Sequence, residues 1–203
     1  MVMQTLPRTV PNSVGTIDRS NAQKTEYCPK CGKAIVQISL TLDKFATIHA
    51  EDLDIVEGRK FSADENQRNV NGKQLYYARD RRTGDRMHRL IAAKHVEDLT
   101  GLQVDHKSPD TLDNRWECNI RAATPAQNHW NRPPSARNTT GYKGVSVYGD
   151  KFLAKIRGLD GKDIRIGVFA TAKEAAKKYN KMAERLHGEF AWLNSIESEQ
   201  EVA

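Results

Sequence analysis

The side chains best suited to chemistry cluster between residues 102 and 132, in the string LQVDHKSPDTLDNRWECNIRAATPAQNHWNR. It contains Asp105 next to His106, and later Asn119, Asn128 and His129. A histidine side chain titrates at about pH 6.5, so near neutral pH it can take a proton from a water molecule. Carboxylate and amide oxygens are ligands that suit Mg²⁺ and Mn²⁺. Together these side chains suit phosphodiester hydrolysis, which needs an activated water and stabilised charge on the phosphoryl oxygens.

The charge pattern agrees with a cation site beside bound phosphate. The chain of 203 residues has 32 Lys and Arg against 26 Asp and Glu, a net charge of +6 and a pI near 9.2. Residues 95–131 are acidic overall, whereas 68–94 and 141–190 are basic. This arrangement suits a site that gathers carboxylates for a cation while its neighbours hold phosphate. The alternative is that the charges are scattered over solvated faces.

Short elements must position these side chains. The pattern predicts a strand over Leu102–His106, a polar loop, a second strand over Cys118–Ala122, and then a helix. Thr124 can cap this helix, Pro125 stands at its first position, and Gln127 completes a capping box. Two prolines, Pro133 and Pro134, end it after about two turns.

This strand–strand–helix unit resembles the HNH endonuclease family and its ββα-metal site. The resemblance rests on Asp105-His106, on Asn119 thirteen residues after the histidine, and on Asn128 nine residues further on. It covers the string from 102 to 132, and extends more loosely upstream through the segment MHRLI, as in phage-type HNH homing endonucleases.

The resemblance implies a role for each residue. His106 would be the general base, and Asp105 and Asn128 would bind one divalent cation, with Mg²⁺ (or Mn²⁺) favoured because both donate oxygen. Asn119 would hold the His106 loop by hydrogen bonds from its side chain to the backbone. His129 is the alternative ligand to Asn128, because neighbouring helical residues differ by about 100° and cannot occupy one position. Adjacent strand residues face opposite sides, so Asp105 and His106 can converge only if their strand ends or twists there.

Residues 141–194 predict a separate module. Val145 and Val147, Ala154 and Ile156, and Ile164 and Ile166 alternate with polar residues, as in three strands. Thr171 and Glu174 form a capping box for a helix that ends at Gly188. We expect a three-stranded antiparallel sheet with one face covered by this helix and the other face exposed.

This second module, with YKGV, FLAKIR and IGVFATAKEAAKKYNKMAERLHGEFAWLN, resembles the Apetala-two or ethylene-response-factor DNA-binding domain. The family lays its sheet in the major groove of double-stranded DNA. Several arginines and tryptophans of the family are replaced here, at Lys143, Ser146, Tyr148 and Gly167, so the target sequence cannot be carried over. The DNA-facing role is implied for Lys143, Ser146, Tyr148, Lys155, Arg157 and Arg165.

Three cysteines argue against a disulfide framework and favour a reducing compartment. Cys28 and Cys31, in CPKCG, form half of a zinc-binding knuckle. A structural zinc site needs four ligands, and the only other cysteine in the sequence is Cys118. A remnant of a zinc site, a redox-inert turn, and a site completed by histidine or by a partner chain all stay open.

The sequence as a whole predicts an α+β protein. We expect a loose tail over 1–26, an HNH nuclease domain over 27–132 with a β-rich N-terminal part, a linker over 133–140, the DNA-binding domain over 141–195, and an acidic tail over 196–203. Strands are predicted within 34–48, and helices over Ala50–Glu57 and Met87–Val96.

The predicted function is a metal-dependent endonuclease that cuts duplex DNA, monomeric, phage-borne and of homing type. The alternative is a DNA-binding regulatory protein with an inactive HNH site. No stretch reaches the roughly 18 apolar residues of a membrane span, and no signal pattern opens the chain. We therefore set membrane and secreted proteins aside and expect a phage-encoded protein in the cytoplasm of a bacterial host.

Overall fold

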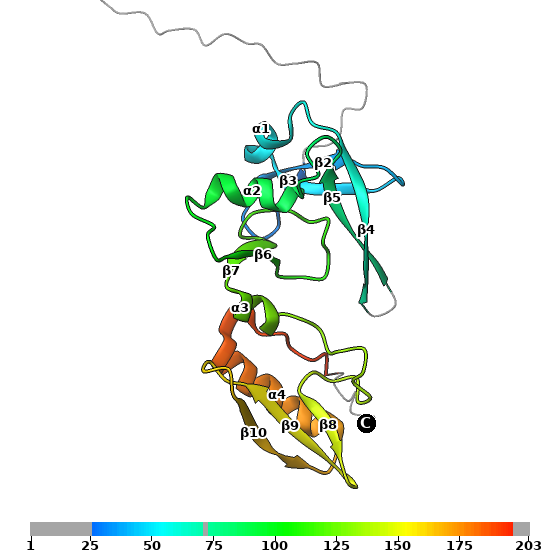
Figure 1. Ribbon diagram of the computed structural model, residues 1–203, viewed down its shortest axis with the longest axis vertical. Coiled ribbons are helices and arrows are strands. Elements are labelled where there is room, and N and C mark those ends of the chain that lie inside the picture. Colours follow the sequence, from blue (N-terminus) through cyan, green and yellow to red (C-terminus); the bar gives the residue numbers. More distant parts are fainter. Residues whose placement is uncertain (1–25, 71–72, 197–203) are drawn as a thin grey trace, which may run out of the picture.

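The computed structural model describes residues 26–70 and 73–196 (Figure 1). The predicted tails fall almost entirely outside these residues. Within them the protein mixes helices with small antiparallel sheets, which confirms the α+β class. No helix in the described part is long and apolar enough to cross a membrane.

The N-terminal half is built from one small sheet, a hairpin and short helices. Strands β1 (Glu26–Tyr27), β2 (Ala34–Ser39) and β3 (Phe45–His49) form a three-stranded sheet in that order. The helix expected over 50–57 begins as a 3₁₀ turn, η1 (Ala50–Asp52), and continues as α1 (Leu53–Val56). Strands β4 (Phe61–Val70) and β5 (Lys73–Asp80) form a hairpin, and α2 (Met87–His95) follows.

The core of this half joins β3, the hairpin, α2 and the strand that follows Asn119. Helix α2 buries Met87 and Ile91, one turn apart, together with His88 and Ala92. Ala93, on the other side of the helix, is exposed. The buried apolar cluster consists of Ala46, Ile48, Val56, Phe61, Ala78, Met87, Ile91 and Ile120.

The segment with the candidate chemistry forms a two-stranded sheet followed by a short helix. Strand β6 (Gln103–His106) pairs antiparallel with β7 (Ile120–Ala123), and α3 (Pro125–Trp130) comes next. Strand β7 begins two residues later than predicted because residues before it turn, with Glu117 at φ 59°. The predicted capping box of α3 is confirmed, since Thr124 accepts from the Gln127 amide and the Gln127 side chain accepts from the Thr124 amide.

The C-terminal module is the predicted sheet and helix. Strands β8 (Val145–Tyr148), β9 (Lys151–Arg157) and β10 (Asp163–Phe169) form an antiparallel sheet in the order β10-β9-β8, and α4 (Ala172–His187) packs on one face. A 3₁₀ turn, η2 (Gly188–Phe190), follows. Gly144 has φ 75°, and a Cβ there would lie 2.2 Å from the Tyr179 ring, so α4 requires glycine at this position.

The two halves contact each other through α3, which lies between them (Figure 1). The Trp130 ring stacks on the His187 ring at 4.3 Å between centroids, with the planes 3° apart. The Trp192 amide donates to the Trp130 carbonyl oxygen at 3.2 Å, and Arg121 donates to the Glu189 carbonyl oxygen at 2.7 Å. Direct packing therefore positions the C-terminal module against the segment that carries Asp105 and His106.

Candidate active site

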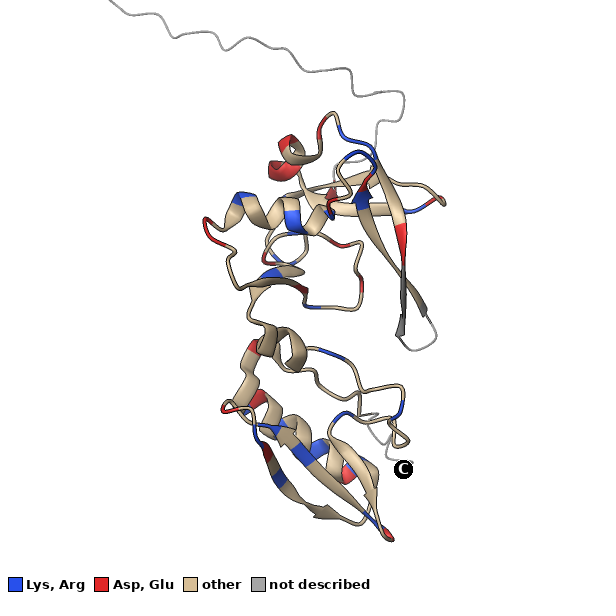
Figure 2. Ribbon diagram, viewed as in Figure 1, with Lys and Arg blue, Asp and Glu red and all other residues tan. Residues whose placement is uncertain are grey.

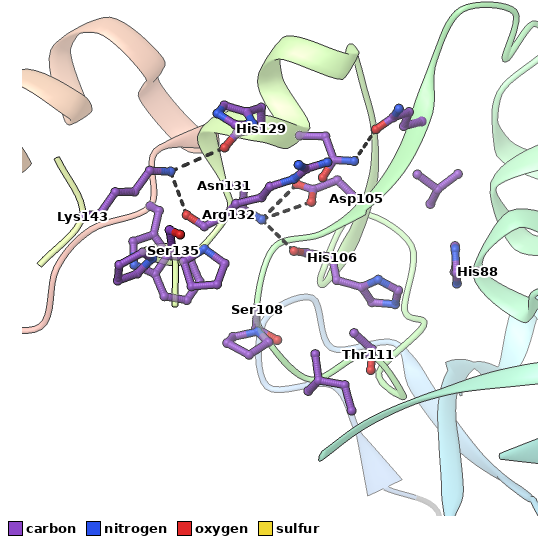
Figure 3. A pocket seen from close by; sticks show the side chains of 18 of the residues that line it. His88, Asp105, His106, Ser108, Thr111, His129, Asn131, Arg132, Ser135 and Lys143 are labelled. Carbon is purple, nitrogen blue, oxygen red and sulfur yellow. Dashed lines mark hydrogen bonds between the residues drawn. The ribbon is translucent and has the colours of Figure 1, made fainter. Parts of the chain in front are cut away.

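A cavity of about 1070 Å³ lies where the two halves meet (Figure 3). Its walls include Asp105, His106, Asn128 and His129, which the sequence singled out, and Lys143 from the C-terminal module. The side chains of Asp105 and His106 leave β6 in different directions, as alternation along a strand requires. Both nevertheless reach the cavity because the strand ends at His106.

The His106 ring is held by Asn114. Asn114 uses its Nδ2 as a donor to the Leu112 carbonyl oxygen at 3.1 Å and to the Met87 sulfur at 3.6 Å, which turns its Oδ1 toward His106. His106 Nε2 lies 3.3 Å from this oxygen, so Nε2 carries the proton in the neutral ring. Nδ1 is then left with a lone pair. Burial lowers the pKa of His106, more than the Asn114 hydrogen bond raises it, so the neutral ring is favoured near neutral pH.

Two further rings lie beside His106, a grouping that sequence analysis did not predict. The His88 ring centroid lies 4.9 Å from that of His106, and the Tyr77 centroid 5.9 Å. Burial lowers the pKa of His88 to about 2, with smaller electrostatic contributions from His106, Arg86 and Arg89. His88 is therefore a neutral packing partner in the wall of the cavity.

The Asp105 carboxylate is buried and makes contacts that were not predicted. Arg121, its partner across the sheet, donates to Oδ2 from Nε at 3.2 Å and from Nη2 at 3.0 Å. Asn131 Nδ2 lies 3.2 Å from Oδ1 and 3.0 Å from Oδ2, and 2.7 Å from the His106 carbonyl oxygen. Asn131 follows Asn128 by three residues, close to one helical turn, and this spacing is the signal that could have identified it.

Asn119 holds the loop that follows His106. Its Oδ1 accepts from the Ser108 amide at 3.0 Å, and its Nδ2 donates to the carbonyl oxygens of Asp110 at 3.0 Å and Asp113 at 2.8 Å. The Lys107 amide also donates to the Asn119 carbonyl oxygen at 2.6 Å. This is the arrangement of side-chain to backbone hydrogen bonds that was expected of Asn119.

Asn128 lines the cavity but does not contact Asp105 through its amide nitrogen. Its Nδ2 donates to Gln103 Oε1, two residues before Asp105 on the same side of β6. The Asn128 amide oxygen and the Asp105 carboxylate thus belong to neighbouring elements around one cavity. These hard oxygen donors fit a cation such as Mg²⁺. The neighbouring His129 side chain is exposed.

Five of the six predicted DNA-facing residues share one exposed face of the C-terminal sheet. The register pairs Arg165 with Lys155 and Asp163 with Arg157. Figure 2 shows basic and acidic positions close together on this sheet. Asp163, which the prediction did not consider, lies 3.1 Å from both Lys155 Nζ and Arg157 Nε, so a carboxylate partly neutralises this face. The exposed predicted residues are Ser146, Tyr148, Lys155, Arg157 and Arg165.

The sixth predicted residue, Lys143, does not lie with the other five. Its Nζ donates to the carbonyl oxygens of Trp130 at 2.5 Å and Arg132 at 2.7 Å, at the C-terminal end of α3. Burial, followed by the nearby Arg132 charge, lowers its pKa to about 8. Free carbonyl groups at a helix C-terminus attract a cation, which explains this position. Lys143 therefore joins the two halves of the protein.

Comparison with known proteins gives one relative. Over 113 residues the chain is 34% identical to a protein named as an uncharacterized HNH endonuclease of Acanthamoeba polyphaga mimivirus. The match covers 55% of this chain and 58% of the relative, so the chain spans little more than half of that protein's length. No family model matches, and no solved structure matches. The similarity supports the HNH nuclease family, which the motif in 102–132 also resembles.

Proposed function

We propose that the protein is a metal-dependent endonuclease of the HNH type that hydrolyses phosphodiester bonds in duplex DNA. The observation that carries the proposal is the grouping of Asp105, His106 and Asn128 around one cavity, with Asn119 holding the intervening loop. The strand–strand–helix order of β6, β7 and α3 supports a ββα-metal site. The named HNH relative supports the same family independently of the geometry.

In this mechanism His106 removes a proton from the attacking water. Its Nδ1 accepts that proton, because Asn114 orients the ring and keeps the hydrogen on Nε2. Burial keeps the ring neutral and so able to accept. Asn119 fixes the backbone on either side of the loop, which sets the direction in which the imidazole points.

Asp105 and Asn128 would hold the divalent cation, with Mg²⁺ or Mn²⁺ favoured by their oxygen donors. A cation bound there supplies positive charge for the phosphoryl and leaving oxygens. Asn131 keeps the carboxylate of Asp105 pointed into the cavity, and Arg121 limits its negative charge while no cation is bound.

The C-terminal module would bind DNA with its exposed sheet face, in the manner of an Apetala-two-like domain. Lys155, Arg157 and Arg165 supply positive charge for phosphate, and Tyr148 offers a flat ring beside Arg165, whose guanidinium carbon lies 5.5 Å from the ring centroid. Because the module packs on α3, duplex held on this face has a defined position relative to His106.

Nicking of supercoiled plasmid tests the proposal. Wild-type protein should convert plasmid to open circles with Mg²⁺, and His106→Ala should lower the rate by at least about 100-fold while DNA binding persists. His129→Ala is the matched control, because this exposed histidine lines the same cavity and should retain cleavage. No cleavage by wild-type protein with Mg²⁺, Mn²⁺ or Ni²⁺ would contradict the proposal.

A DNA-binding regulator with an inactive HNH site is the second candidate. The observation that favours it is the Arg121–Asp105 ion pair, which places a buried positive charge beside a candidate cation ligand. A regulator of this kind should bind DNA in a sequence-dependent way and should not cleave it with Mg²⁺, Mn²⁺ or Ni²⁺.

We further propose that the endonuclease is of the homing type and is encoded by a phage. It would be monomeric and would act on DNA in the cytoplasm of a bacterial host. One active site per chain supports one nick per bound monomer. Mapping the cut positions on long DNA, together with the molar mass in solution, tests these points. Cuts at random positions would remove the homing type but not the endonuclease.

A further inference from the structure

Four metal-binding side chains meet in the N-terminal half, away from the candidate active site. Cys28 and Cys31 come from the turn between β1 and β2, His49 ends β3, and Cys118 lies in the turn before β7. Their ligand atoms all lie within 4.8 Å of one another. The sequence showed only the Cys28–Cys31 pair, because the other two ligands come from 18 and 87 residues further along.

The measured separations match a tetrahedral zinc site. Bonds of about 2.3 Å from zinc to sulfur and about 2.0–2.1 Å to nitrogen place two sulfurs about 3.8 Å apart, and a sulfur and a nitrogen about 3.6 Å apart. Cys28 Sγ lies 3.6 Å from Cys118 Sγ, and Cys31 Sγ lies 3.4 Å from His49 Nε2. A set of three cysteines and one histidine is a common donor set for structural zinc.

The backbone around the first pair has the shape of a metal-binding knuckle. The Gly32 amide donates to the Cys28 carbonyl oxygen at 2.8 Å, and the Cys28 amide donates to the Lys33 carbonyl oxygen at 2.8 Å. Gly32 has φ 71°, which a side chain would disfavour. The turn thus points Cys28 and Cys31 to the same side.

Positive charges lie where a zinc site would need them. Three thiolates and one Zn²⁺ leave one negative charge, and Arg115 Nη1 lies 3.0 Å from Cys28 Sγ. Lys30 Nζ donates to the Cys118 carbonyl oxygen at 2.9 Å.

We propose that Cys28, Cys31, His49 and Cys118 bind one structural Zn²⁺. This ion would link the N-terminal sheet of β1, β2 and β3 to the loop between β6 and β7. Cys118 precedes Asn119, whose side chain holds the loop after His106. The same sheet is attached at a second point, where the Thr47 amide donates to the Leu112 carbonyl oxygen at 2.9 Å and the Asn114 amide donates to the Thr47 carbonyl oxygen at 2.7 Å. Zinc therefore supports the residues that orient His106 without itself belonging to the active site.

Metal content of the purified full chain is the first test. Elemental analysis of wild-type protein should give about one zinc per chain. Cys31→Ser should lose most of the bound zinc. Because Cys31 is exposed, we expect this variant to fold without the metal. His129→Asn, at an exposed histidine outside the cluster, should keep a full complement. Retention of zinc by Cys31→Ser, or a metal-free wild-type protein that does not take up zinc, would overturn the proposal.

Cobalt substitution tests the ligand set. Wild-type protein loaded with Co²⁺ should show the visible bands of a tetrahedral ion and a thiolate-to-cobalt charge-transfer band. His49→Cys should keep tetrahedral Co²⁺ with a stronger charge-transfer band, because it converts the site to four thiolates. An unchanged spectrum in this variant would exclude His49 as a ligand.

Two measurements complete the test. Removing zinc with a strong chelator should lower the Tm by roughly 10 °C or more, and adding zinc, but not Mg²⁺, should restore it.

Intact mass under non-reducing conditions should show three free thiols after zinc removal. A mass lower by two hydrogens, from a Cys28–Cys118 disulfide in the protein as purified, would contradict the zinc site. None of these measurements depends on DNA cleavage, so the two proposals can fail separately.

Discussion

Asn131 Nδ2 donates toward both carboxylate oxygens of Asp105, at 3.2 and 3.0 Å. The same nitrogen lies 2.7 Å from the His106 carbonyl oxygen, so one amide group ties α3 to the end of β6. Asn131 comes three residues after Asn128, whose own side chain bonds Gln103 on the same strand as Asp105. The position of the Asp105 carboxylate depends on Asn131.

The first prediction concerns Asn131→Ala. Without the amide the Asp105 carboxylate is free to turn toward Arg121, so cleavage should fall about 10–100-fold, with a higher Mg²⁺ concentration needed for half-maximal rate. Plasmid nicking over a Mg²⁺ titration measures both quantities. His129→Ala, two residues away on the exposed side, should behave as wild type. Equal Mg²⁺ dependence in Asn131→Ala and wild type would contradict this role.

Asp105→Asn should remove metal-dependent cleavage while preserving the shape of the side chain. The loss should be at least about 100-fold, since the amide supplies no negative charge to a cation. The variant should also be less stable by about 1–3 kcal/mol, because the buried Arg121 guanidinium loses one of its two carboxylate partners and keeps only Glu189. Nicking assays and urea unfolding measure the two effects. Full activity in Asp105→Asn would exclude this residue as a ligand.

His88 should make the protein sensitive to mild acid. Its pKa is lowered to about 2 in the folded protein, whereas the unfolded chain binds a proton at about pH 6.5. Below pH 6.5 the unfolded state therefore binds more protons, and stability falls as pH decreases, by up to about 1.4 kcal/mol per pH unit. Above pH 6.5 this residue contributes no pH dependence.

His88→Phe tests that statement, because phenylalanine preserves ring packing against Tyr77 without a titrating group. Unfolding free energy measured from pH 7 to pH 4.5 should fall less steeply in the variant than in wild type. Parallel curves for the two proteins would show that His88 is not the residue responsible.

DNA affinity should respond in opposite directions to two changes on the sheet face. Arg157→Ala should weaken binding and lower the slope of log affinity against log salt by about 1, leaving cleavage at saturating DNA largely intact. Asp163→Asn should strengthen binding, because it removes the carboxylate that lies 3.1 Å from both Lys155 and Arg157. Fluorescence anisotropy at several salt concentrations measures both. Weaker binding by Asp163→Asn would place the DNA on another surface.

The sequence was most informative where the structure depends on neighbours along the chain. The capping box at Thr124 is confirmed, and at the next helix Thr171 accepts from the Glu174 amide, which is one of the two hydrogen bonds of the predicted box. These hydrogen bonds join residues three apart. Alternation along β9 predicted which side chains are exposed, since strand residues face alternate sides whatever the sheet packs against. The prediction was less accurate where a turn intervenes, as at the start of β7.

Residue types, spacing and the resemblance to known families predicted the set Asp105, His106, Asn119 and Asn128, the two modules, and the half-site at Cys28 and Cys31. Only the tertiary structure decided that Arg121 and Asn131 hold Asp105, that Lys143 joins the modules, and that His49 and Cys118 complete a cluster of four ligands. The physical reason is that these contacts depend on strand register and on the packing of distant segments. Periodicity and capping act over a few residues, and they do not specify which remote side chains a folded chain brings together.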